Sequence, residues 1–311
     1  MLFIYDIIKT SKEVMFVDIR VLKYFLAVAQ EENITKAAEL LHTTQPNLSR
    51  QLTLLEEEVG KKLFYRGNRK ISLTQEGMFL RKRAKEIIDL TERTESELTS
   101  YGEATTGEII IGAPETSAMH MIAEVFKSIH GSYPKIQFHI FSGSTTEVSD
   151  QLHKGLLDFA ILIEPIDLTK YDYIKIPYTD TWGVLMRDDC PLAALDTIRP
   201  ENIKNEPIFL AQQQISANVL SGWFKKYYRN LNIIGTFNLI TTPAMIVESG
   251  LGYVFTFQNL INTTGDSRLC FKPLEPNFET GFYLVWKKYQ IFTKPAELFL
   301  DEVQHIMSTY Q

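Results

Sequence analysis

The sequence predicts a two-part α/β protein, in which a helical N-terminal head is joined by one long helix to a larger body of alternating strands and helices. Apolar residues recur at helical spacing through residues 19–60, and a 4,3 spacing of apolar residues runs through residues 80–101. From residue 107 onward, strand signals alternate with helix signals. A length of 311 residues suits two domains, and 45% hydrophobic with 23% charged residues excludes collagen-like and low-complexity chains.

Several classes of protein are disfavoured by local features. No run of 18 apolar residues occurs, so we expect no transmembrane helix and no membrane partner. The opening MLFIYDII carries Asp6 and no basic leader, which is unlike a signal peptide. Two cysteines, Cys190 and Cys270, suit a reducing compartment. We therefore expect a soluble cytoplasmic protein.

The charge is unevenly divided along the chain. Residues 15–83 carry a net charge of +4, whereas residues 84–311 carry −10. Between residues 66 and 85 one acidic residue, Glu76, stands among seven basic ones: Arg66, Arg69, Lys70, Arg81, Lys82, Arg83 and Lys85. A basic head on an acidic body indicates that the head meets a polyanion, although a solvated helix face is the simpler alternative.

The head has the pattern of a helix-turn-helix. A first amphipathic helix is expected from residue 19 to 30 and a short second helix, rich in alanine, from 36 to 41. Thr44 is a plausible N-cap of a third helix with Pro46 in its first turn. The buried stripe of this helix is Leu48, Leu52, Leu55 and Val59, and the helix ends at Gly60. Two short helices with small residues at their crossing are typical of this motif.

The other face of the third helix carries short polar side chains that can hydrogen-bond base edges in a major groove. Residues 62–73 then predict a basic hairpin, or wing, with a Gly67-Asn68 turn that can reach the sugar-phosphate backbone. Together they form the candidate DNA-binding set: Thr35, Thr44, Gln45, Pro46, Asn47, Ser49, Arg50, Arg66, Arg69 and Lys70.

Six motifs in this order closely resemble the winged helix-turn-helix of LysR-type transcriptional regulators. They are A-V-A at 27–29, T-K-A-A-E-L-L at 35–41, Q-P-x-L-S-R-Q at 45–51, L-E-x-E-x-G at 55–60, L-F-x-R at 63–66 and L-T-x-x-G at 73–77. The resemblance implies a DNA-binding domain over 17–74 and a linker over 75–106. Family chains begin near the position of Val17, so we expect residues 1–16 to be an extension, with translation starting at Met1, Met15 or Val17.

The linker has the spacing of a coiled coil. Thr74 can cap a long helix, in which every third or fourth residue from Leu80 to Tyr101 falls on one seam. The resemblance makes this the dimerising helix of a homodimer or homotetramer. The candidate dimerisation residues are Leu80, Ala84, Ile87, Leu98 and Tyr101.

The body predicts parallel α/β sheets, because its strands are short and nearly continuously apolar. Strands are expected near 108–113, 135–141, 157–163, 182–187, 208–210, 234–240 and 253–256, with helices near 117, 145–154, 216–230 and 242–250. The phrases G-L-L-D-F-A at 155–160 and E-S-G-L-G-Y at 248–253 resemble the LysR effector-binding domain, which has two lobes like those of periplasmic binding proteins. The resemblance implies an effector-binding domain over 107–311, with lobe one over 107–163 and 270–311 and lobe two over 164–269.

No catalytic, metal or cofactor signature is present. The six histidines show no paired ligand spacing, and neither a phosphate-binding loop nor a nucleophile elbow occurs. We expect no enzyme, no metal and no cofactor, and we expect both cysteines to be structural although some family members sense peroxide with a cysteine pair.

Candidate effector contacts lie where strands end and helices begin, since helix N-termini there offer free N–H groups. They are Thr116, Ser117, Ser142, Ser144, Thr145, Gln213, Thr241 and Thr242. The alternative for each hydroxyl is that it only caps its helix. Glu115 would repel a carboxylate unless a cation intervened, and it could favour an amine-bearing ligand.

The leading hypothesis is a LysR-type regulator whose binding to a pseudo-palindromic promoter is modulated by a small metabolite, with double-stranded DNA and RNA polymerase as partners. One alternative is a solute-binding or enzymatic α/β protein with an incidental helical head. A second is a DNA-architectural protein without ligand control. The basic wing and Q-P-x-L-S-R disfavour the first, and the acidic body of about 200 residues disfavours the second.

Overall fold

A computed structural model of the chain describes residues 18–67, 70–99, 105–212 and 220–309. They fall into two compact units, one ending at Ser96 and the other beginning at Glu97. The expected extension, residues 1–16, lies outside the described residues. No helix in these ranges combines the length and the apolar character that a bilayer crossing requires.

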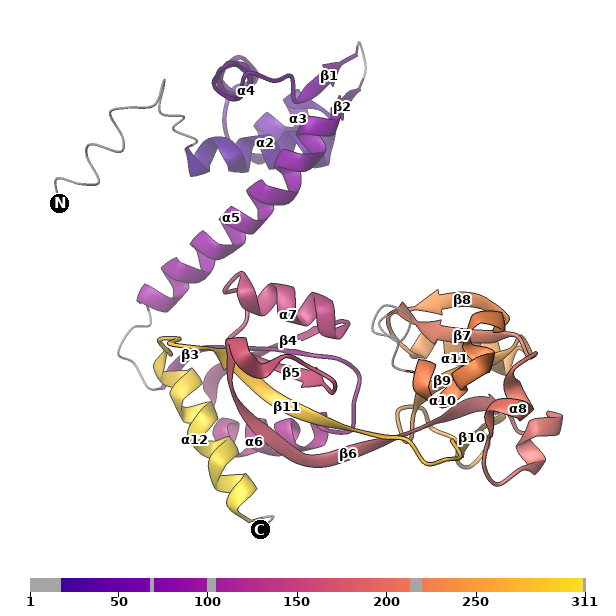
Figure 1. Cartoon of the computed structure of the whole chain (residues 1–311). Coiled ribbons are helices and arrows are strands. Elements are labelled where there is room, and N and C mark those ends of the chain that lie inside the picture. The colour runs from indigo at the N-terminus through magenta and orange to yellow at the C-terminus, as the bar shows by residue number, and fades with distance from the viewer. Residues whose placement is uncertain (1–17, 68–69, 100–104, 213–219, 310–311) are drawn as a thin grey trace. The chain divides into compact units, whose positions relative to one another are not determined.

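The N-terminal unit has the expected order of three helices, a hairpin and a long helix (Figure 1). Its elements are α2 Ile19–Glu31, α3 Ile34–Leu40, α4 Gln45–Val59, β1 Phe64–Arg66, β2 Ile71–Leu73 and α5 Gln75–Thr99. The two strands are antiparallel, with Phe64 opposite Leu73 and Arg66 opposite Ile71.

Side-chain caps explain where these helices begin. The Asp18 carboxylate accepts a hydrogen bond from the Arg20 N–H at the start of α2, and Asn33 accepts one from Lys36 at the start of α3. The predicted cap of α4 is confirmed, since the Thr44 hydroxyl accepts from the Asn47 N–H at 3.4 Å. The helix ends at Gly60, whose φ of +66° is the left-handed conformation that glycine adopts without strain.

The core of the N-terminal unit corrects the predicted dimerisation seam. Phe25, Leu48 and Leu52 are fully buried there, as the sequence pattern predicts. Ala84 is also fully buried in this core, and Leu80 packs against it, so neither is available as a seam residue in the way expected. The early turns of α5 pack against the core of their own domain. The apolar stripe that continues through Ile88 is therefore buried within this unit.

The exposed apolar face of α5 lies to one side of that stripe. Ile87 and Leu98 of the predicted seam are exposed, and so are Phe79 and Leu90, which the spacing rule left out. Tyr101 lies outside the described residues. At 100° per residue, these four exposed positions share one helical face that borders the buried one.

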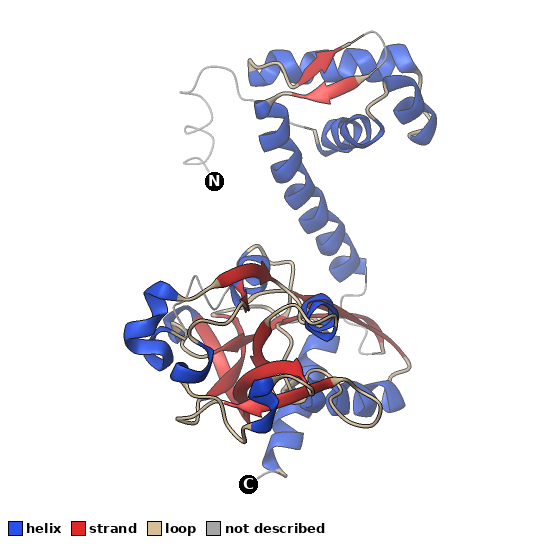
Figure 2. Cartoon of the chain, turned by 90° about the vertical axis from the view of Figure 1, so that its right-hand side faces the viewer, coloured by secondary structure: helices blue, strands red, loops and turns tan. Residues whose placement is uncertain are grey.

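The C-terminal unit has its strands at the centre and its helices around them (Figure 2). The strands are β3 Thr106–Ala113, β4 Lys135–Ser142, β5 Phe159–Ile163, β6 Tyr171–Arg187, β7 Ile208–Ala211, β8 Ile233–Phe237, β9 Tyr253–Phe257, β10 Leu269–Pro273 and β11 Glu279–Lys287. The α-helices are α6 Met119–Ser132, α7 Thr145–His153, α8 Pro200–Ile203, α10 Ser221–Phe224, α11 Thr241–Glu248 and α12 Lys294–Ser308. Short 3-10 helices cover Leu168–Lys170, Pro191–Ala194 and Lys225–Asn230.

The helix expected at 216–230 is only partly present. Its first residues fall in the undescribed stretch 213–219, and the rest is divided into α10 and a 3-10 helix. The division falls at Lys225, whose φ of +49° is incompatible with a continuing α-helix.

Two long strands connect the lobes. The strands follow the order β4-β3-β5-β11-β6-β9-β7-β8, with β10 also paired to β6. The predicted parallel pairing is present where β3 meets β4 and β5, and where β7 meets β8 and β9. In contrast, β6 pairs antiparallel with β9, β10 and β11. Figure 1 shows β6 and β11 running between lobe one and lobe two.

This pairing corrects the predicted lobe boundaries. Residues 171–176 of β6 pair with β11 in lobe one, although the predicted boundary puts them in lobe two. Residues 269–273 form β10, which pairs with the far half of β6 in lobe two, although 270 onward was assigned to lobe one. The first crossing therefore falls inside β6 after Ile176. The second falls between Pro273 and Phe282, where the start of β11 pairs with residues 179–181 of β6.

Candidate nucleic-acid interface and ligand cleft

The first turn of α4 presents polar side chains outward. Gln45, Pro46, Asn47 and Arg50 are exposed, whereas Leu48 between them is fully buried. Ser49 is half-buried, and Thr35 and Thr44 are exposed at the starts of α3 and α4. The helix is therefore held by its apolar face while its opposite face and its free N–H groups remain open to a ligand.

Two of these side chains have different tasks. The Asn47 amide donates to the Thr43 hydroxyl at 3.0 Å, and the Asn47 N–H is capped by Thr44, so Asn47 stabilises the turn. The Gln45 side chain has no hydrogen-bond partner among the described residues, which leaves both its donor and its acceptor for a base edge.

A buried carboxylate anchors the wing. Glu56 of α4 accepts hydrogen bonds from the Leu63 N–H at 2.8 Å and the Phe64 N–H at 3.2 Å, and it pairs with the Lys62 ammonium at 3.0 Å. Burial alone raises the pKa of the Glu56 carboxyl, but the hydrogen bonds from Leu63, Lys62 and Phe64 outweigh burial and leave the pKa below its usual value. The L-E-x-E-x-G motif thus contains the residue that holds the start of β1.

The joint between the wing and α5 is equally tight. The Thr74 hydroxyl donates to the Lys62 carbonyl at 2.7 Å and accepts from the Gly77 N–H at 2.9 Å, which confirms the predicted cap of α5. A Cβ at Gly77 would lie 2.1 Å from the Leu63 carbonyl oxygen. The L-T-x-x-G motif therefore encodes one cap and one close backbone approach.

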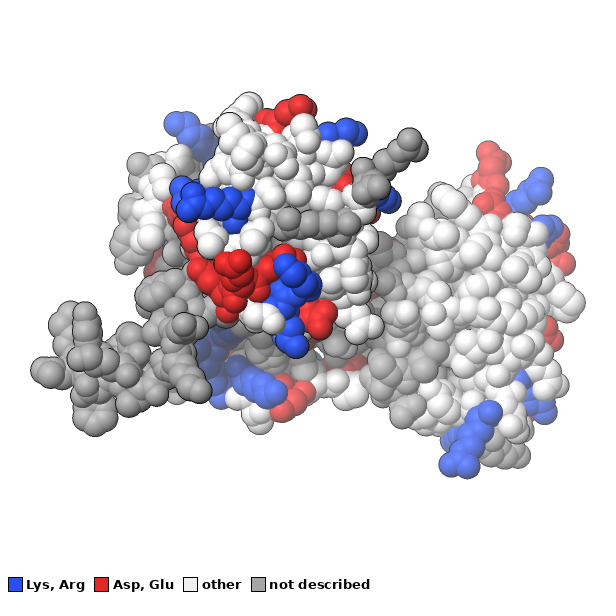
Figure 3. All heavy atoms as spheres, turned by 90° about the horizontal axis from the view of Figure 1, so that it is seen from above, with Lys and Arg blue, Asp and Glu red and all other residues white. Residues whose placement is uncertain are grey.

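The basic residues of the wing are only partly described. Arg66 ends β1, Arg69 lies outside the described residues, and the exposed Lys70 pairs with the Glu32 carboxylate. Figure 3 shows that acidic and basic side chains are interspersed on the face seen from above, and that much of lobe two, on the right, is uncharged there.

The predicted effector loops meet at a cavity between the lobes. It is lined by Pro114, Glu115, Gly143, Trp182, Ala211, Phe237, Asn238, Ile240, Phe255, Thr256, Phe257 and Leu260. Its free volume of about 30 Å³ is roughly that of one water molecule, so the cleft is nearly closed in this structure. We call it the interlobe cleft.

Two predicted effector residues, Thr116 and Ser117, hold a buried carboxylate. Asp180 of β6 accepts from the Thr116 hydroxyl at 2.8 Å and from the Ser117 N–H at 3.1 Å, and the Ser117 hydroxyl also bonds to it. This network ties the loop after β3 to the strand that crosses between the lobes. Both hydroxyls therefore have internal partners in this structure.

The other predicted residues divide between caps and open positions. Ser144 forms a capping box with Glu147, which is the alternative expected for a helix-capping hydroxyl. Thr241 and Thr242 are exposed at the start of α11, and Ser142 is exposed at the end of β4. Thr145 lies in the first turn of α7, and Gln213 lies outside the described residues. The predicted loops reach the interlobe cleft, but the residues lining it are their neighbours, and the assignment of these hydroxyls stays a prediction.

Glu115 makes a bond across the cleft. Its Oε2 accepts from the Ile240 N–H of lobe two at 2.6 Å. Ile240 is the N-cap of α11 and offers no side-chain cap of its own, so lobe one supplies the missing acceptor. Burial raises the pKa of the Glu115 carboxyl above its usual value, because burial outweighs this one hydrogen bond.

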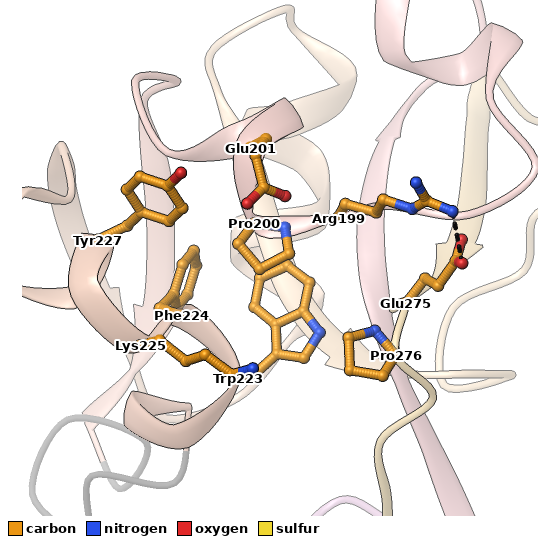
Figure 4. A pocket seen from close by; sticks show the side chains of 9 residues that line it. All are labelled: Arg199, Pro200, Glu201, Trp223, Phe224, Lys225, Tyr227, Glu275 and Pro276. Atoms are coloured by element: carbon orange, nitrogen blue, oxygen red, sulfur yellow. Dashed lines mark hydrogen bonds and ion pairs between the residues drawn. The ribbon is translucent and has the colours of Figure 1, made fainter.

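A larger cavity, which sequence reasoning missed, lies within lobe two. It has a volume of about 560 Å³, and its walls include Trp223, Phe224 and Tyr227. In Figure 4 the Trp223 indole lies between Pro200 and Pro276, with the Arg199–Glu275 ion pair of 2.7 Å beyond. No sequence signal marks this cavity, because segments near residues 200, 224 and 276 meet only in the folded lobe.

Cys270 does not have the environment of a reactive thiol. Both cysteines are half-buried and free of disulfides, and burial is the main reason that the pKa of the Cys270 thiol is raised. Nowhere among the described residues do three or more His, Cys, Asp or Glu side chains gather as a metal site requires.

Comparison with known proteins places both units in one family. Residues 19–78 match the bacterial regulatory helix-turn-helix protein, lysR family, and residues 102–308 match the LysR substrate binding domain. The chain is 30% identical over 291 residues to the HTH-type transcriptional regulator BsdA of Bacillus subtilis (strain 168), covering 91% of this chain and 99% of that protein. It is 27% identical over 286 residues to the Hca operon transcriptional activator HcaR of Escherichia coli (strain K12), covering 90% and 94%.

The fold agrees with this assignment. The structure of full-length CbnR complexed with its target DNA superposes with a TM-score of 0.71 at 18% identity, covering 93% of this chain and 99% of that one. Two matching domains in the family's order, with regulators as relatives along nearly the whole length, support one conclusion. The chain belongs to the LysR family of helix-turn-helix transcriptional regulators.

Proposed function

We propose that this regulator reads double-stranded DNA with the first turn of α4. The observation that carries the proposal is the exposed Gln45 amide, which has no hydrogen-bond partner among the described residues. It lies beside the capped Asn47 on a helix whose other face is buried. Such a turn fits a major groove, where an amide makes a bidentate contact to adenine. CbnR, which has a similar fold, was solved in complex with its target DNA, and this supports DNA as the ligand.

The wing and Arg50 are proposed to bind the DNA backbone. Arg50 is exposed on α4, and Arg66 and Lys70 flank the tip of the hairpin. Lys70 pairs with Glu32 in the free protein, and a phosphate would have to replace that carboxylate. These contacts position the helix without reading sequence.

The remaining parts are proposed to control this binding. The interlobe cleft takes a small effector, and α5 pairs protomers through the exposed face formed by Phe79, Ile87, Leu90 and Leu98. A homodimer or homotetramer places two α4 helices on one duplex, where DNA geometry affects recruitment of RNA polymerase. The proposed compartment is the cytoplasm.

A test of DNA reading compares two glutamine substitutions. The wild-type protein selects duplexes from a randomised pool, and binding of the selected and scrambled duplexes is then measured by fluorescence anisotropy at several salt concentrations. Gln45→Ala should weaken the selected duplex by about 1–3 kcal/mol and the scrambled one hardly at all. Gln304→Ala, an equally exposed glutamine on α12, should change neither. Unchanged sequence preference in Gln45→Ala would exclude Gln45 as a reader.

A further inference from the structure

The described walls of the interlobe cleft carry almost no ionisable side chains. Among the described residues that line it, Glu115 is the only one that ionises, and no Lys, Arg or His is present. An anionic ligand in this cleft would find a carboxylate and, among the described lining residues, no cation.

Only one oxygen of the Glu115 carboxylate accepts a hydrogen bond from the described residues. Oε2 accepts from the Ile240 N–H, while Oε1 has no hydrogen-bond partner among the described residues. The Ile240 N–H, one of the N–H groups at the start of α11, is therefore already occupied by a carboxylate of this chain. A ligand carboxylate that used this N–H would have to displace Glu115 and then remain near it, and like charges in a partly buried site repel.

Four aromatic rings complete the walls of the cleft. They belong to Trp182, Phe237, Phe255 and Phe257, and the rings of Trp182 and Phe257 are 4.3 Å apart between centroids. The faces of aromatic rings carry partial negative charge and attract cations, most strongly where water is excluded. The aromatic faces and the Glu115 carboxylate thus both favour a positively charged ligand.

One buried donor in the cleft also lacks a partner. Trp182 is only 3% exposed, and its indole N–H has no hydrogen-bond acceptor among the described residues. A buried donor without an acceptor is unfavourable by about 1–3 kcal/mol, and a ligand oxygen would satisfy it.

We infer that the interlobe cleft selects a compact cation, a primary ammonium that also carries one hydrogen-bond acceptor, and that it rejects carboxylates. The ammonium donates to Glu115 Oε1 beside the aromatic rings, and the acceptor receives the Trp182 N–H. This inference rests on the proposed role of the cleft as the effector site. The free volume in this structure is about that of one water molecule, so a ligand of a few heavy atoms enters only if the lobes separate.

Matched probes test the inference on the full-length protein. Ethanolamine, ethylene glycol and glycolate share a hydroxyethyl-like size and differ in charge, while n-propylamine keeps the ammonium and lacks the acceptor. Binding is measured by isothermal titration calorimetry, with tryptophan emission as a second readout. We expect ethanolamine to bind at least tenfold more tightly than each of the others.

Two matched substitutions locate the site. Glu115→Gln keeps the shape and removes the charge, and it should weaken ethanolamine at least tenfold. Glu201→Gln makes the same change in the wall of the larger cavity of lobe two and should leave binding unchanged. Trp182→Phe should abolish the emission change on binding, whereas Trp223→Phe should retain it.

Each other outcome contradicts the inference. Preferential binding of glycolate shows that the cleft is a ligand site of the opposite class. If Glu201→Gln loses ethanolamine binding and Glu115→Gln keeps it in full, the cation binds in the larger cavity of lobe two and not in the interlobe cleft. Absence of ethanolamine binding to the wild-type protein overturns the cation site, while the separately measured DNA preference of Gln45→Ala still tests the proposed function.

Discussion

Gly77 is where the packing of the N-terminal unit is least tolerant of an added atom. It lies in the first turn of α5 and is buried, and a Cβ there would approach the Leu63 carbonyl oxygen to 2.1 Å. Real Cβ atoms essentially never come closer than 3.0 Å, so the two segments would have to move apart. Leu63 cannot move freely, because its N–H is held by Glu56 and its carbonyl accepts from the Thr74 N–H at 3.0 Å.

Two opposing effects decide whether Gly77→Ala stabilises or destabilises the N-terminal unit. Alanine is favoured over glycine in a helix by up to about 1 kcal/mol. Overpacking against a backbone atom costs about 1–3 kcal/mol, and loss of the Thr74–Leu63 hydrogen bond adds about 1 kcal/mol. The net expectation is a destabilisation of about 2 kcal/mol, which lowers the Tm of a unit of this size by roughly 8–16 °C.

Calorimetry of the full-length protein measures this effect, since the two units can unfold in separate transitions. All three tryptophans, at 182, 223 and 286, belong to the C-terminal unit, so their emission should report an unchanged transition. Gly131→Ala is the matched control, because a Cβ at this helical glycine of α6 meets nothing within 4 Å. It should stabilise its own unit by up to about 1 kcal/mol. If Gly77→Ala were as stable as the wild type, the close approach of α5 to Leu63 would be wrong.

Three further expectations follow from buried or exposed groups. Glu56→Gln should destabilise the N-terminal unit by about 1–3 kcal/mol at pH 7, unlike Glu57→Gln on the exposed side. The pKa of Glu56 is lowered in the folded state, so the difference in unfolding free energy between wild type and Glu56→Gln should shrink as pH falls below about 4.5. Urea titrations measure this difference, and a value that stays constant with pH would contradict the role of the Glu56 carboxylate in holding the wing. Ile87→Glu should weaken self-association at least tenfold in analytical ultracentrifugation while Lys85→Glu does not, and equal behaviour of the two would move the interface elsewhere. Asp180→Asn should lower the stability of the C-terminal unit by about 1–3 kcal/mol, and an unchanged urea midpoint would show that its network contributes little.

The N-terminal unit was largely predictable because its signals are local. The cap at Thr44, the stripe through Leu48 and Leu52, and the stop at Gly60 each act within one helix. The motif residues Glu56 and Gly77 stand in the sequence as a carboxylate and a glycine, but their tasks involve Leu63, several residues away in each case. The sequence shows that these two residues are present, but it does not show which residue they contact.

The seam on α5 shows how tertiary contacts select among equivalent patterns. A 4,3 spacing identifies an apolar stripe without saying what covers it. Folding places Ala84 against the core of its own domain and leaves Ile87 exposed, although both fit the same heptad. The packing of the N-terminal unit therefore decides which apolar residues of α5 remain exposed to a second protomer.

By itself, the sequence determined the family, the order of elements in the N-terminal unit and the loops that reach the interlobe cleft, since spacing, caps and motifs act over a few residues. Only the tertiary structure decided where β6 crosses between the lobes, that Thr116 and Ser117 hold Asp180, and that Glu115 caps α11. These last bonds join residues more than 60 positions apart, and no local preference encodes them. They form because burial in the cleft makes an unpaired carboxylate or N–H group unfavourable, so each group takes the partner that the folded lobes bring to it.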